Sequence, residues 1–382
     1  MRLLYVTSLS GKRINGFMRS AIIAAKSLGF EFTMACNTDM ADKAGYEQDC
    51  KEYGIETAHI DFDRNPLGKK NKIAYQQLNK LMSEREFDIV HCNTPIGGVL
   101  GRICAKKNKI PAVIYQAHGF HFWKGAPLQN WLFYYPVEKL LSHWTDVLIT
   151  INKEDYKRAK KHMHAKQVEY VPGVGIDFKR FAKTQVDRAA KRKEIGIPED
   201  AILLLSVGEL IERKNHASVI RSLAELNEKR VHYVIAGMGP LKDSLTALAI
   251  SSGVEKQVHL IGFRQDVAEL FKAADVFVFP SHQEGLPMAV MEAMAAGLPI
   301  VASAIRGTID LLENSDNPLV ADSNDVGDYA KKIKSLCASD YLRVKIGQNN
   351  QKAAAKYNTL EIVEQMMSIY KRCILQAEKQ VK

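Results

Sequence analysis

The sequence predicts an α/β protein built from two domains, and three observations lead to this. The chain has 382 residues, more than one hydrophobic core normally serves. Short apolar runs alternate with longer amphipathic segments, the pattern of a parallel sheet covered by helices on both faces. The alternation occurs in two sets that meet near YVPGVGID, residues 170–177. We therefore expect two Rossmann-like domains that face one another across a cleft.

Ten short apolar runs are the expected strands, five in each half. Those of the first half are residues 3–7, 32–36, 88–92, 112–116 and 146–150. Those of the second half are residues 202–207, 232–237, 258–262, 276–280 and 299–303. With a hinge at Pro172-Gly173, residues 1–172 form the expected N-terminal domain and residues 173–359 the C-terminal one.

The composition is that of a soluble globular protein, with 46% hydrophobic and 25% charged residues. No apolar run reaches the ~18 residues of a membrane span, and the apolar run at the N-terminus fits a first strand better than a signal peptide. The six cysteines include no C-x-x-C pair, which suits reduced thiols in the cytoplasm and predicts no zinc site.

The net charge of +10 is unevenly distributed. Residues 1–172 hold 25 Lys+Arg and 17 Asp+Glu, a balance of +8, and the remaining 28 and 26 leave +2. The excess includes lysine-rich patches at residues 69–72, 106–109 and 157–162. A basic face attracts nucleic acid, anionic lipid or phosphorylated substrates, although any single patch is equally well a solvated surface.

In open parallel sheets, ligands bind beyond the carboxyl ends of the strands, so residues that follow strands are candidates. Gly11 and Gly16 form a turn that can bring backbone N–H groups close to an anion, or a simple tight turn. His118 directly follows a strand, where substrate contact and a structural role are equally plausible. Three aromatic residues next to it fit the core slightly better than an apolar lip near a membrane: Phe120, Phe122 and Trp123.

In the second half, Gly208 permits a sharp turn after a strand. Arg213 and Lys214 then stand near the start of the next helix, where cations make sense mainly beside a multiply charged anion such as a diphosphate. Gly237 begins another turn in which a ligand could approach the backbone closely. Two residues after the next strand are expected to flank a nucleobase: Phe263 and Arg264.

The stretch SHQEGLPMAVMEAMAAG keeps carboxylates in an apolar run. Glu284 lies in the loop after a buried strand, Pro287 suits the first turn of a helix, and Gly297 is expected to end that helix. Gly285 and Leu286 then offer backbone N–H groups at the helix start, a seat for phosphate oxygens.

Glu292 lies about one and a half turns into the same helix. Carboxylates accept hydrogen bonds, so Glu284 and Glu292 suit sugar and ribose hydroxyl groups. A phosphate seat between two such carboxylates indicates a nucleotide sugar. The alternative is a glutamate favoured by the helix dipole plus an ordinary surface glutamate.

The ordered set of these motifs resembles the family-4 retaining glycosyltransferases of the GT-B fold, over nearly the whole chain. The matching pieces are the N-terminal glycine turn, AHGF, PGVGID, GELIERKN, AGMGP, the GF turn and E-x7-E in EGLPMAVME. The runs HCNTPIGGVLGR, AHGFHFW and IRGTID are similar to bacterial enzymes that build capsule, exopolysaccharide or glycan precursors on a polyprenyl diphosphate carrier.

The resemblance implies roles for individual residues. Glu284 and His118 would contact the donor sugar, Glu292 the ribose and Lys214 the diphosphate. The remaining donor-site residues would be Gly11, Gly16, Gly208, Arg213, Gly237, Phe263, Arg264, Gly285, Leu286 and Pro287. Many relatives have an arginine just after the strand glycine, where this chain has Glu209, so that role is open to Arg213. Residues 360–382 would cross back to the N-terminal domain.

The resemblance further implies transfer with retention, without a metal in the site or another cofactor. We expect a cytoplasmic enzyme, peripherally attached to an anionic membrane surface, that moves a hexose or N-acetylhexosamine from a UDP-sugar to a polyprenyl-diphosphate-linked saccharide. The alternatives are a UDP-sugar epimerase, a transferase with a soluble acceptor, a non-catalytic nucleotide-sugar sensor and a nucleic-acid-binding protein, the last of which we do not expect. Asp61 and Asp63 spell a D-x-D metal motif, for which we favour a plain loop.

Overall fold

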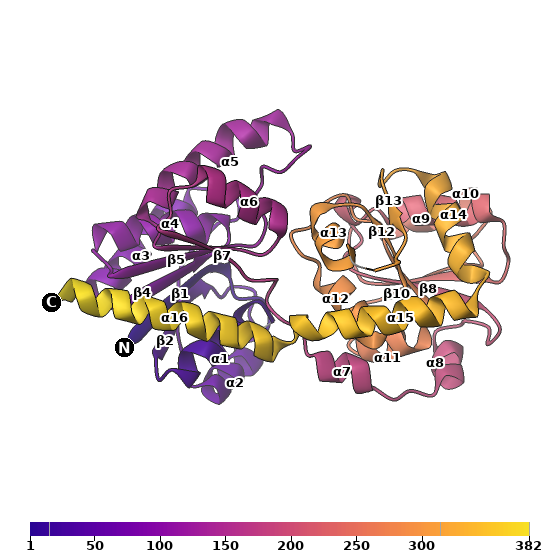
Figure 1. Cartoon of the computed structure of the whole chain (residues 1–382), viewed down its shortest axis with the longest axis horizontal. Coiled ribbons are helices and arrows are strands. Elements are labelled where there is room, and N and C mark those ends of the chain that lie inside the picture. Colours follow the sequence, from indigo (N-terminus) through magenta and orange to yellow (C-terminus); the bar gives the residue numbers. More distant parts are fainter. Residues whose placement is uncertain (15, 314, 382) are drawn as a thin grey trace. The chain divides into compact units, whose positions relative to one another are not determined.

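The computed structural model describes residues 1–14, 16–313 and 315–381. The chain forms two compact units (Figure 1). Unit 1 comprises Met1–Gly175 together with the segment from Thr359 on, and unit 2 is Ile176–Asn358. The division lies within three residues of the boundaries expected at 172/173 and 359/360. Each unit is a parallel sheet with helices on both faces, so the predicted fold class is confirmed.

Unit 1 contains a seven-stranded sheet in the order β3-β2-β1-β4-β5-β6-β7. Its strands are β1 (Arg2–Leu9), β2 (Glu31–Asn37), β3 (Glu56–His59), β4 (Ile89–Asn93), β5 (Ala112–Ala117), β6 (Val147–Thr150) and β7 (Gln167–Tyr170). One face is covered by α1 (Gly16–Ser27), α2 (Lys43–Tyr53) and α16 (Thr359–Val381). The other is covered by α3 (Lys70–Glu84), α4 (Pro95–Lys107), α5 (Leu128–Leu141) and α6 (Lys153–His162), and the short helix η1 (Ser142–Trp144) follows α5.

Unit 2 contains a six-stranded sheet in the order β10-β9-β8-β11-β12-β13. Its strands are β8 (Ile202–Val207), β9 (Val231–Ala236), β10 (Val258–Gly262), β11 (Val276–Phe279), β12 (Ile300–Ser303) and β13 (Leu319–Val320). Helices α9 (His216–Leu226), α10 (Lys242–Ser251) and α14 (Val326–Cys337) pack on one face. The other helices are α7 (Phe178–Lys183), α8 (Arg188–Glu194), α11 (Val267–Ala273), α12 (Met288–Ala296), α13 (Arg306–Leu312), α15 (Asp340–Ala354), η2 (Glu212–Lys214) and η3 (Ala355–Tyr357).

All ten predicted strands are present, and the described residues add β3, β7 and β13. These three form sheet edges. The sequences of β3 (ETAH) and β7 (QVEY) are polar because each strand pairs on one side only and stays partly exposed. Strand β13 has two residues, too few for a periodic pattern.

The strand orders place a topological switch point in each unit. The sheet order reverses between β1 and β4 in unit 1, and between β8 and β11 in unit 2. Chains that leave neighbouring strands in opposite directions at such a point open a crevice at the carboxyl ends. The loops after these four strands are therefore where ligands are expected.

The segment expected to cross back, residues 360–382, forms most of α16, which packs on the unit 1 sheet; its last residue, Lys382, lies outside the described residues. Six of its side chains lie in the core cluster with α1 and β1: Ile362, Val363, Met366, Ile369, Tyr370 and Cys373. The Tyr370 hydroxyl lies 2.8 Å from Nδ1 of His91 on β4. No helix in the described part of the chain is long and apolar enough to cross a membrane.

We expect the contact between His91 and Tyr370 to contribute measurably to the free energy of unfolding of unit 1. His91 is buried, its Nε2 has no hydrogen-bond partner among the described residues, and burial lowers its pKa to about 3. Tyr370→Phe removes the partner of Nδ1 on this buried imidazole, so we expect a loss of roughly 1–3 kcal/mol in the free energy of unfolding. Urea denaturation followed by tryptophan fluorescence measures it, since all three tryptophans belong to unit 1.

The matched control is Tyr53→Phe in the same unit. The Tyr53 hydroxyl forms no hydrogen bond within the described residues, and its ring packs at the edge of the same core cluster. We expect less than about 0.5 kcal/mol for this variant. Equal losses for the two variants would remove the case for the His91 contact.

Candidate functional site

The loops after β8 and β11 meet at the switch point of unit 2 and bring three charged side chains together. Nζ of Lys214 lies 2.8 Å from Oε1 of Glu284. Nη1 of Arg213 contacts the same oxygen and also donates to the carbonyl oxygen of Gln283 at 3.1 Å. The side chains of Lys214 and Glu284 are each 15% exposed, and that of Arg213 is 40% exposed. We call these three residues the charged cluster.

Local packing explains why the charged cluster forms. Asn215 adopts a left-handed conformation with φ of 52°, and its side-chain amide donates to the carbonyl oxygens of Pro280 and Ser323. A Cβ at Gly208 would lie 3.3 Å from Cε of Lys214, so a glycine there leaves room for the lysine side chain. The ammonium group of Lys214 also lies over the Phe279 ring, 5.1 Å from its centroid. Both loops are thus fixed to one another around the lysine.

Helix α12 begins directly beside the charged cluster. Pro287 is its N-cap residue, and Gly297 ends it with φ of 85°, as the sequence predicts. Among the described residues, the backbone N–H groups of Gly285 and Leu286 have no hydrogen-bond partner. Unpaired N–H groups at a helix start, next to two cations, form a seat for an anion.

A third cation supports this turn, and the sequence analysis gave it no role. Nε of Arg306, whose residue is 9% exposed, donates to the carbonyl oxygen of Glu284 at 3.3 Å. A Cβ at Gly307 would lie 2.7 Å from the carbonyl oxygen of Gly285, so α13 packs closely against the turn. The signal was available, since both residues closely follow β12 in the IRGTID run.

Glu292 lies in the second turn of α12 and is largely buried. Burial raises the pKa of its carboxyl to about 7, and the nearby charge of Arg180 opposes this rise. This burial does not fit the alternative of an ordinary surface glutamate, and the ribose role stays a prediction. A carboxyl that titrates near neutral pH in a loop-lined region is a candidate for a functional group.

Gly237 and the two residues after β10 lie outside the charged cluster. A Cβ at Gly237 would lie 1.7 Å from the carbonyl oxygen of Gly208, so the close approach expected there occurs between two loops of the protein itself. Phe263 is 70% exposed. Within the described residues, Arg264 forms ion pairs with Glu194 and Asp266. Their roles toward a ligand stay predictions.

The remaining predicted residues belong to unit 1 and surround its own switch point. Gly11 has φ of 74° in the loop after β1, and Gly16 is the first residue of α1. Nε2 of His118 lies 2.9 Å from Oδ1 of Asn93, the last residue of β4. Sequence reasoning missed Asn93, although it ends a strand beside the switch point.

His118 is an uncharged hydrogen-bonding group. Burial lowers its pKa to about 4, and Phe17 lies edge-on to it with ring centroids 5.2 Å apart. Because Asn93 Oδ1 accepts a hydrogen bond, Nε2 carries the proton and Nδ1 keeps its lone pair. Nδ1 is buried and has no partner within the described ranges. The imidazole therefore keeps one unused hydrogen-bond acceptor, buried beside the switch point.

The structure also shows where the three aromatic residues after His118 and the two aspartates of the D-x-D motif lie. Phe120 and Phe122 are buried in the unit 1 core, as expected, and Trp123 is partly exposed. Asp61 and Asp63 lie in the loop after β3, where Asp61 accepts from Gln77 at 2.7 Å and Asp63 from the backbone N–H of Asn65 at 2.9 Å. These bonds fit the loop interpretation.

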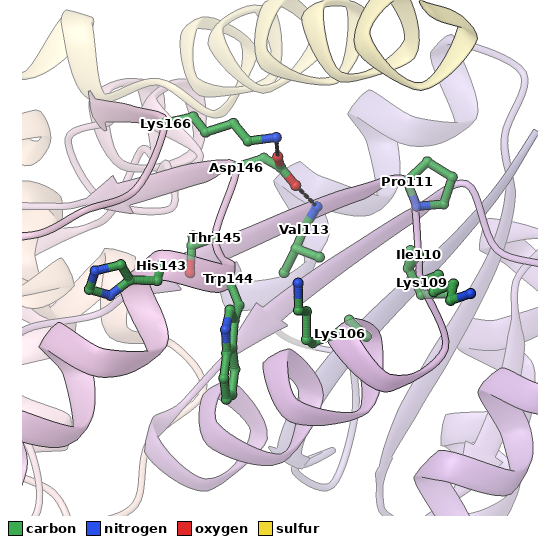
Figure 2. Close-up of a pocket in the computed structure, with 11 residues that line it drawn as sticks. Lys106, Lys109, Ile110, Pro111, Val113, His143, Trp144, Thr145, Asp146 and Lys166 are labelled. Atoms are coloured by element: carbon green, nitrogen blue, oxygen red, sulfur yellow. Dashed lines mark hydrogen bonds and ion pairs between the residues drawn. The ribbon is translucent and has the colours of Figure 1, made fainter. Parts of the chain in front are cut away.

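Figure 2 shows a separate pocket of about 310 Å³ at the amino-terminal ends of β5, β6 and β7. Lys166 pairs with Asp146 at 2.6 Å, and Asp146 accepts from the backbone N–H of Val113 at 2.7 Å. The pocket lies at the opposite strand ends from His118. It therefore has no part in the switch-point site of unit 1.

Comparisons with known proteins agree with this arrangement. Residues 4–152 match the family model "Glycosyl transferase 4-like", and residues 187–353 match "Glycosyl transferases group 1". The Bacillus subtilis protein EpsD is 37% identical over 351 residues, which cover 90% of each chain. The chain belongs to the family-4 glycosyltransferases.

One further relative and one solved structure resemble this glycosyltransferase. An Escherichia coli protein named UDP-Gal:alpha-D-GlcNAc-diphosphoundecaprenol alpha-1,3-galactosyltransferase is 27% identical over 338 residues, covering 84% of this chain and 87% of its own. The crystal structure of Anabaena HepE in complex with UDP superposes with a TM-score of 0.80 at 18% identity, over 97% of this chain and all of HepE. The glycosyltransferase thus has the GT-B fold.

The close packing of α13 on the Gly285 turn predicts that Gly307 is needed for stability of this glycosyltransferase. In Gly307→Ala the new methyl group meets backbone atoms that cannot move aside, so we expect a loss of about 1–3 kcal/mol in the free energy of unfolding. Denaturation followed by circular dichroism measures it. Gly327→Ala is the control, because its Cβ would meet the flexible end of Glu225 at 3.0 Å. A neutral Gly307→Ala variant would mean that α13 does not fix the turn.

Proposed function

We propose that this glycosyltransferase moves a hexose or N-acetylhexosamine from a UDP-sugar to a polyprenyl-diphosphate-linked saccharide in bacterial surface-glycan synthesis, with retention of configuration. The observation that carries the donor half is the charged cluster at the start of α12. The name of the Escherichia coli relative supports the acceptor half. UDP as the nucleotide is supported by the same name and by the HepE complex.

The charged cluster suits a nucleotide diphosphate. Arg213 and Lys214 share one carboxylate, so the cluster keeps an excess of positive charge. A bound diphosphate offers these cations several charge-assisted hydrogen bonds in place of one shared oxygen. The exchange would release Oε1 of Glu284, and the carboxylate would then accept hydrogen bonds from hydroxyl groups of the donor sugar.

The leaving group can be stabilised by protein groups alone. When the bond between the anomeric carbon and the diphosphate oxygen breaks, negative charge grows on the diphosphate. Arg213, Lys214 and the N–H groups of Gly285 and Leu286 are already oriented to stabilise such charge. In front-face transfer, the acceptor oxygen forms the new bond to the anomeric carbon, and its proton passes to the departing diphosphate. Configuration is thereby retained, and we propose that no metal or other cofactor is needed.

Unit 1 supplies the properties expected of an acceptor domain. Its residues 1–172 carry most of the net positive charge, and a polyprenyl diphosphate is an anion held in a bilayer. His118 is uncharged, and its proposed partner is the donor sugar, as the resemblance implies. We therefore assign acceptor binding to unit 1 and peripheral attachment at the cytoplasmic face of the membrane to the enzyme.

The first experiment is UDP release from a panel of UDP-, GDP- and ADP-sugars, with and without a polyprenyl-diphosphate-linked acceptor, in EDTA. We expect release only from a UDP-sugar with the lipid-linked acceptor, undiminished by EDTA. Activity with a soluble acceptor, conversion of the donor without transfer, or UDP binding without turnover would instead indicate a different transferase, an epimerase or a sensor. The anomeric configuration of the product, read by NMR, tests retention.

Glu284→Gln tests the role of the charged cluster. The amide keeps the size of the side chain but loses the charge that holds Arg213 and Lys214 and that binds sugar hydroxyls. We expect transfer to fall roughly 10- to 150-fold, the value of one charge-assisted hydrogen bond. Glu255→Gln, an exposed glutamate of the same unit, is the control. Transfer by Glu284→Gln within twofold of wild type would contradict the donor-sugar role.

Glu292 predicts a pH dependence of donor binding. Its carboxyl has a pKa near 7 in the free protein, and only the ionised form accepts hydrogen bonds from both ribose hydroxyls. The affinity for a UDP-sugar should therefore rise about tenfold between about pH 6 and pH 8. A UDP-sugar is the right probe for titration calorimetry, because its esterified diphosphate keeps a constant charge in this range.

Glu292→Gln is the matched variant for this measurement. Its amide does not titrate, so the affinity should be weaker than in wild type and independent of pH in the same range. A pH dependence that survives in Glu292→Gln would assign the titration to another group and refute the ribose role.

A further inference from the structure

Helix α5 of unit 1 is apolar on both of its faces. Its inner face packs through Trp131 and Tyr135 against Phe122 of the core. The side chain of Glu138 also points inward, where it accepts from buried Arg102 and from the Tyr115 hydroxyl at 2.8 and 2.9 Å. The orientation of α5 is therefore fixed by an aromatic contact and a largely buried ion pair.

The outer face of α5 is exposed and largely apolar, and its charged residue is Lys139, which follows Pro136 by one turn and Leu132 by two turns and is partly exposed. Five large apolar side chains lie on it: Leu128, Leu132, Phe133, Val137 and Leu140, with exposed fractions of 73%, 63%, 70%, 43% and 59%. Gln129 and Pro136, the other exposed residues of this face, are uncharged as well. A surface helix normally has polar residues on its solvent side, and a contiguous exposed apolar face marks an interaction surface.

Basic side chains lie on the elements next to α5. Helix α6 lies beside α5 (Figure 1), with the Arg158 guanidinium 4.6 Å from the centroid of the Trp131 ring, and it exposes Lys157, Lys160 and Lys161. At the other end of α5, His143 stacks on His164 with ring centroids 4.0 Å apart. His143 also lines the pocket of Figure 2, to which three lysines contribute: Lys106, Lys109 and Lys166.

We propose that the outer face of α5 docks this glycosyltransferase onto an anionic lipid bilayer, with the helix lying in the membrane interface. A largely apolar face that carries Lys139 and has further lysines on neighbouring elements is the pattern of an interfacial helix that enters the headgroup region of anionic lipid. A second copy of the chain is a poorer occupant, because pairing this face with itself would bring two basic borders together.

The location of α5 connects docking with the reaction, so the inference deepens the proposed function and rests on it for its biological meaning. The loop that carries His118 at the end of β5 continues directly into α5. A bilayer held against α5 would therefore lie next to the unit 1 switch point, where a lipid-linked acceptor has to arrive. The lysine patch at residues 157–162, left without a role by the charge pattern, then acquires one.

The test is flotation of the full chain with vesicles of phosphatidylcholine, with and without phosphatidylglycerol. We expect binding that requires phosphatidylglycerol and weakens with salt. Leu132→Ser/Phe133→Ser should reduce the partition coefficient at least about tenfold, because two exposed apolar side chains no longer enter the bilayer. Leu67→Ser is the control, since Leu67 is 92% exposed elsewhere on unit 1; its binding should equal that of wild type.

Two results would overturn the inference: equal vesicle binding by wild type and Leu132→Ser/Phe133→Ser, or no binding to anionic vesicles. A concentration-dependent dimer that the double variant abolishes, without vesicle binding, would assign the face to a second copy. Turnover of wild type with a short-chain, detergent-soluble polyprenyl diphosphate acceptor tests the proposed function separately. If the protein docks through α5 but shows no turnover, the inference stands and the proposed function is refuted. If it shows turnover but does not dock, the proposed function stands and the inference is refuted.

Discussion

The proposed donor site in unit 2 depends on one interaction: Arg213 and Lys214 both contact the same carboxylate oxygen of Glu284. It ties the loop after β8 to the loop after β11 at the point where the strand order of unit 2 reverses. Two cations cannot lie this close together without a compensating anion. In the free protein, Glu284 is that anion, and it keeps both cations oriented toward the start of α12. In the proposed function, a diphosphate would take the place of this carboxylate beside the same two cations, so the cations are already gathered before the ligand binds.

The packing around the charged cluster serves this orientation. Gly208 leaves space for Lys214, and Asn215 fixes the end of the short helix that carries both cations. On the other side, Arg306 and Gly307 hold the turn at Gly285 against α13. The supporting residues come from loops after neighbouring strands, so the parallel sheet converts residues far apart in the sequence into one rigid wall. A site held on three strand ends is more exact than one carried by a single loop.

The sequence predicted what local chemistry determines. Buried parallel strands are apolar runs, so ten of them were recognisable, and Pro287 and Gly297 marked the ends of α12 through the backbone geometry each residue favours. Edge strands such as β3 lack that pattern, because their stability comes from one neighbour and not from burial. Arg306 and Asn93 were missed for a related reason: an arginine or asparagine after a strand is unremarkable until the fold brings Glu284 or His118 to it. Burial of Glu292, likewise, follows from tertiary packing that an isolated glutamate in an apolar helix does not reveal.

A segment that departs from the usual relation between sequence and burial is informative when the rest of the fold follows that relation. In unit 1, the helices that cover the sheet bury most of their apolar side chains, and α5 alone in the described chain gathers five large exposed ones on a single face. This exposure is not a failure of packing, since Glu138 and the aromatic residues fix the inner face and leave the outer face no freedom to turn inward. An exposed apolar face carries a risk of aggregation, and the lysines near it reduce that risk by repulsion between copies. In the proposed function, the same lysines would also attract the anionic membrane surface that holds the acceptor.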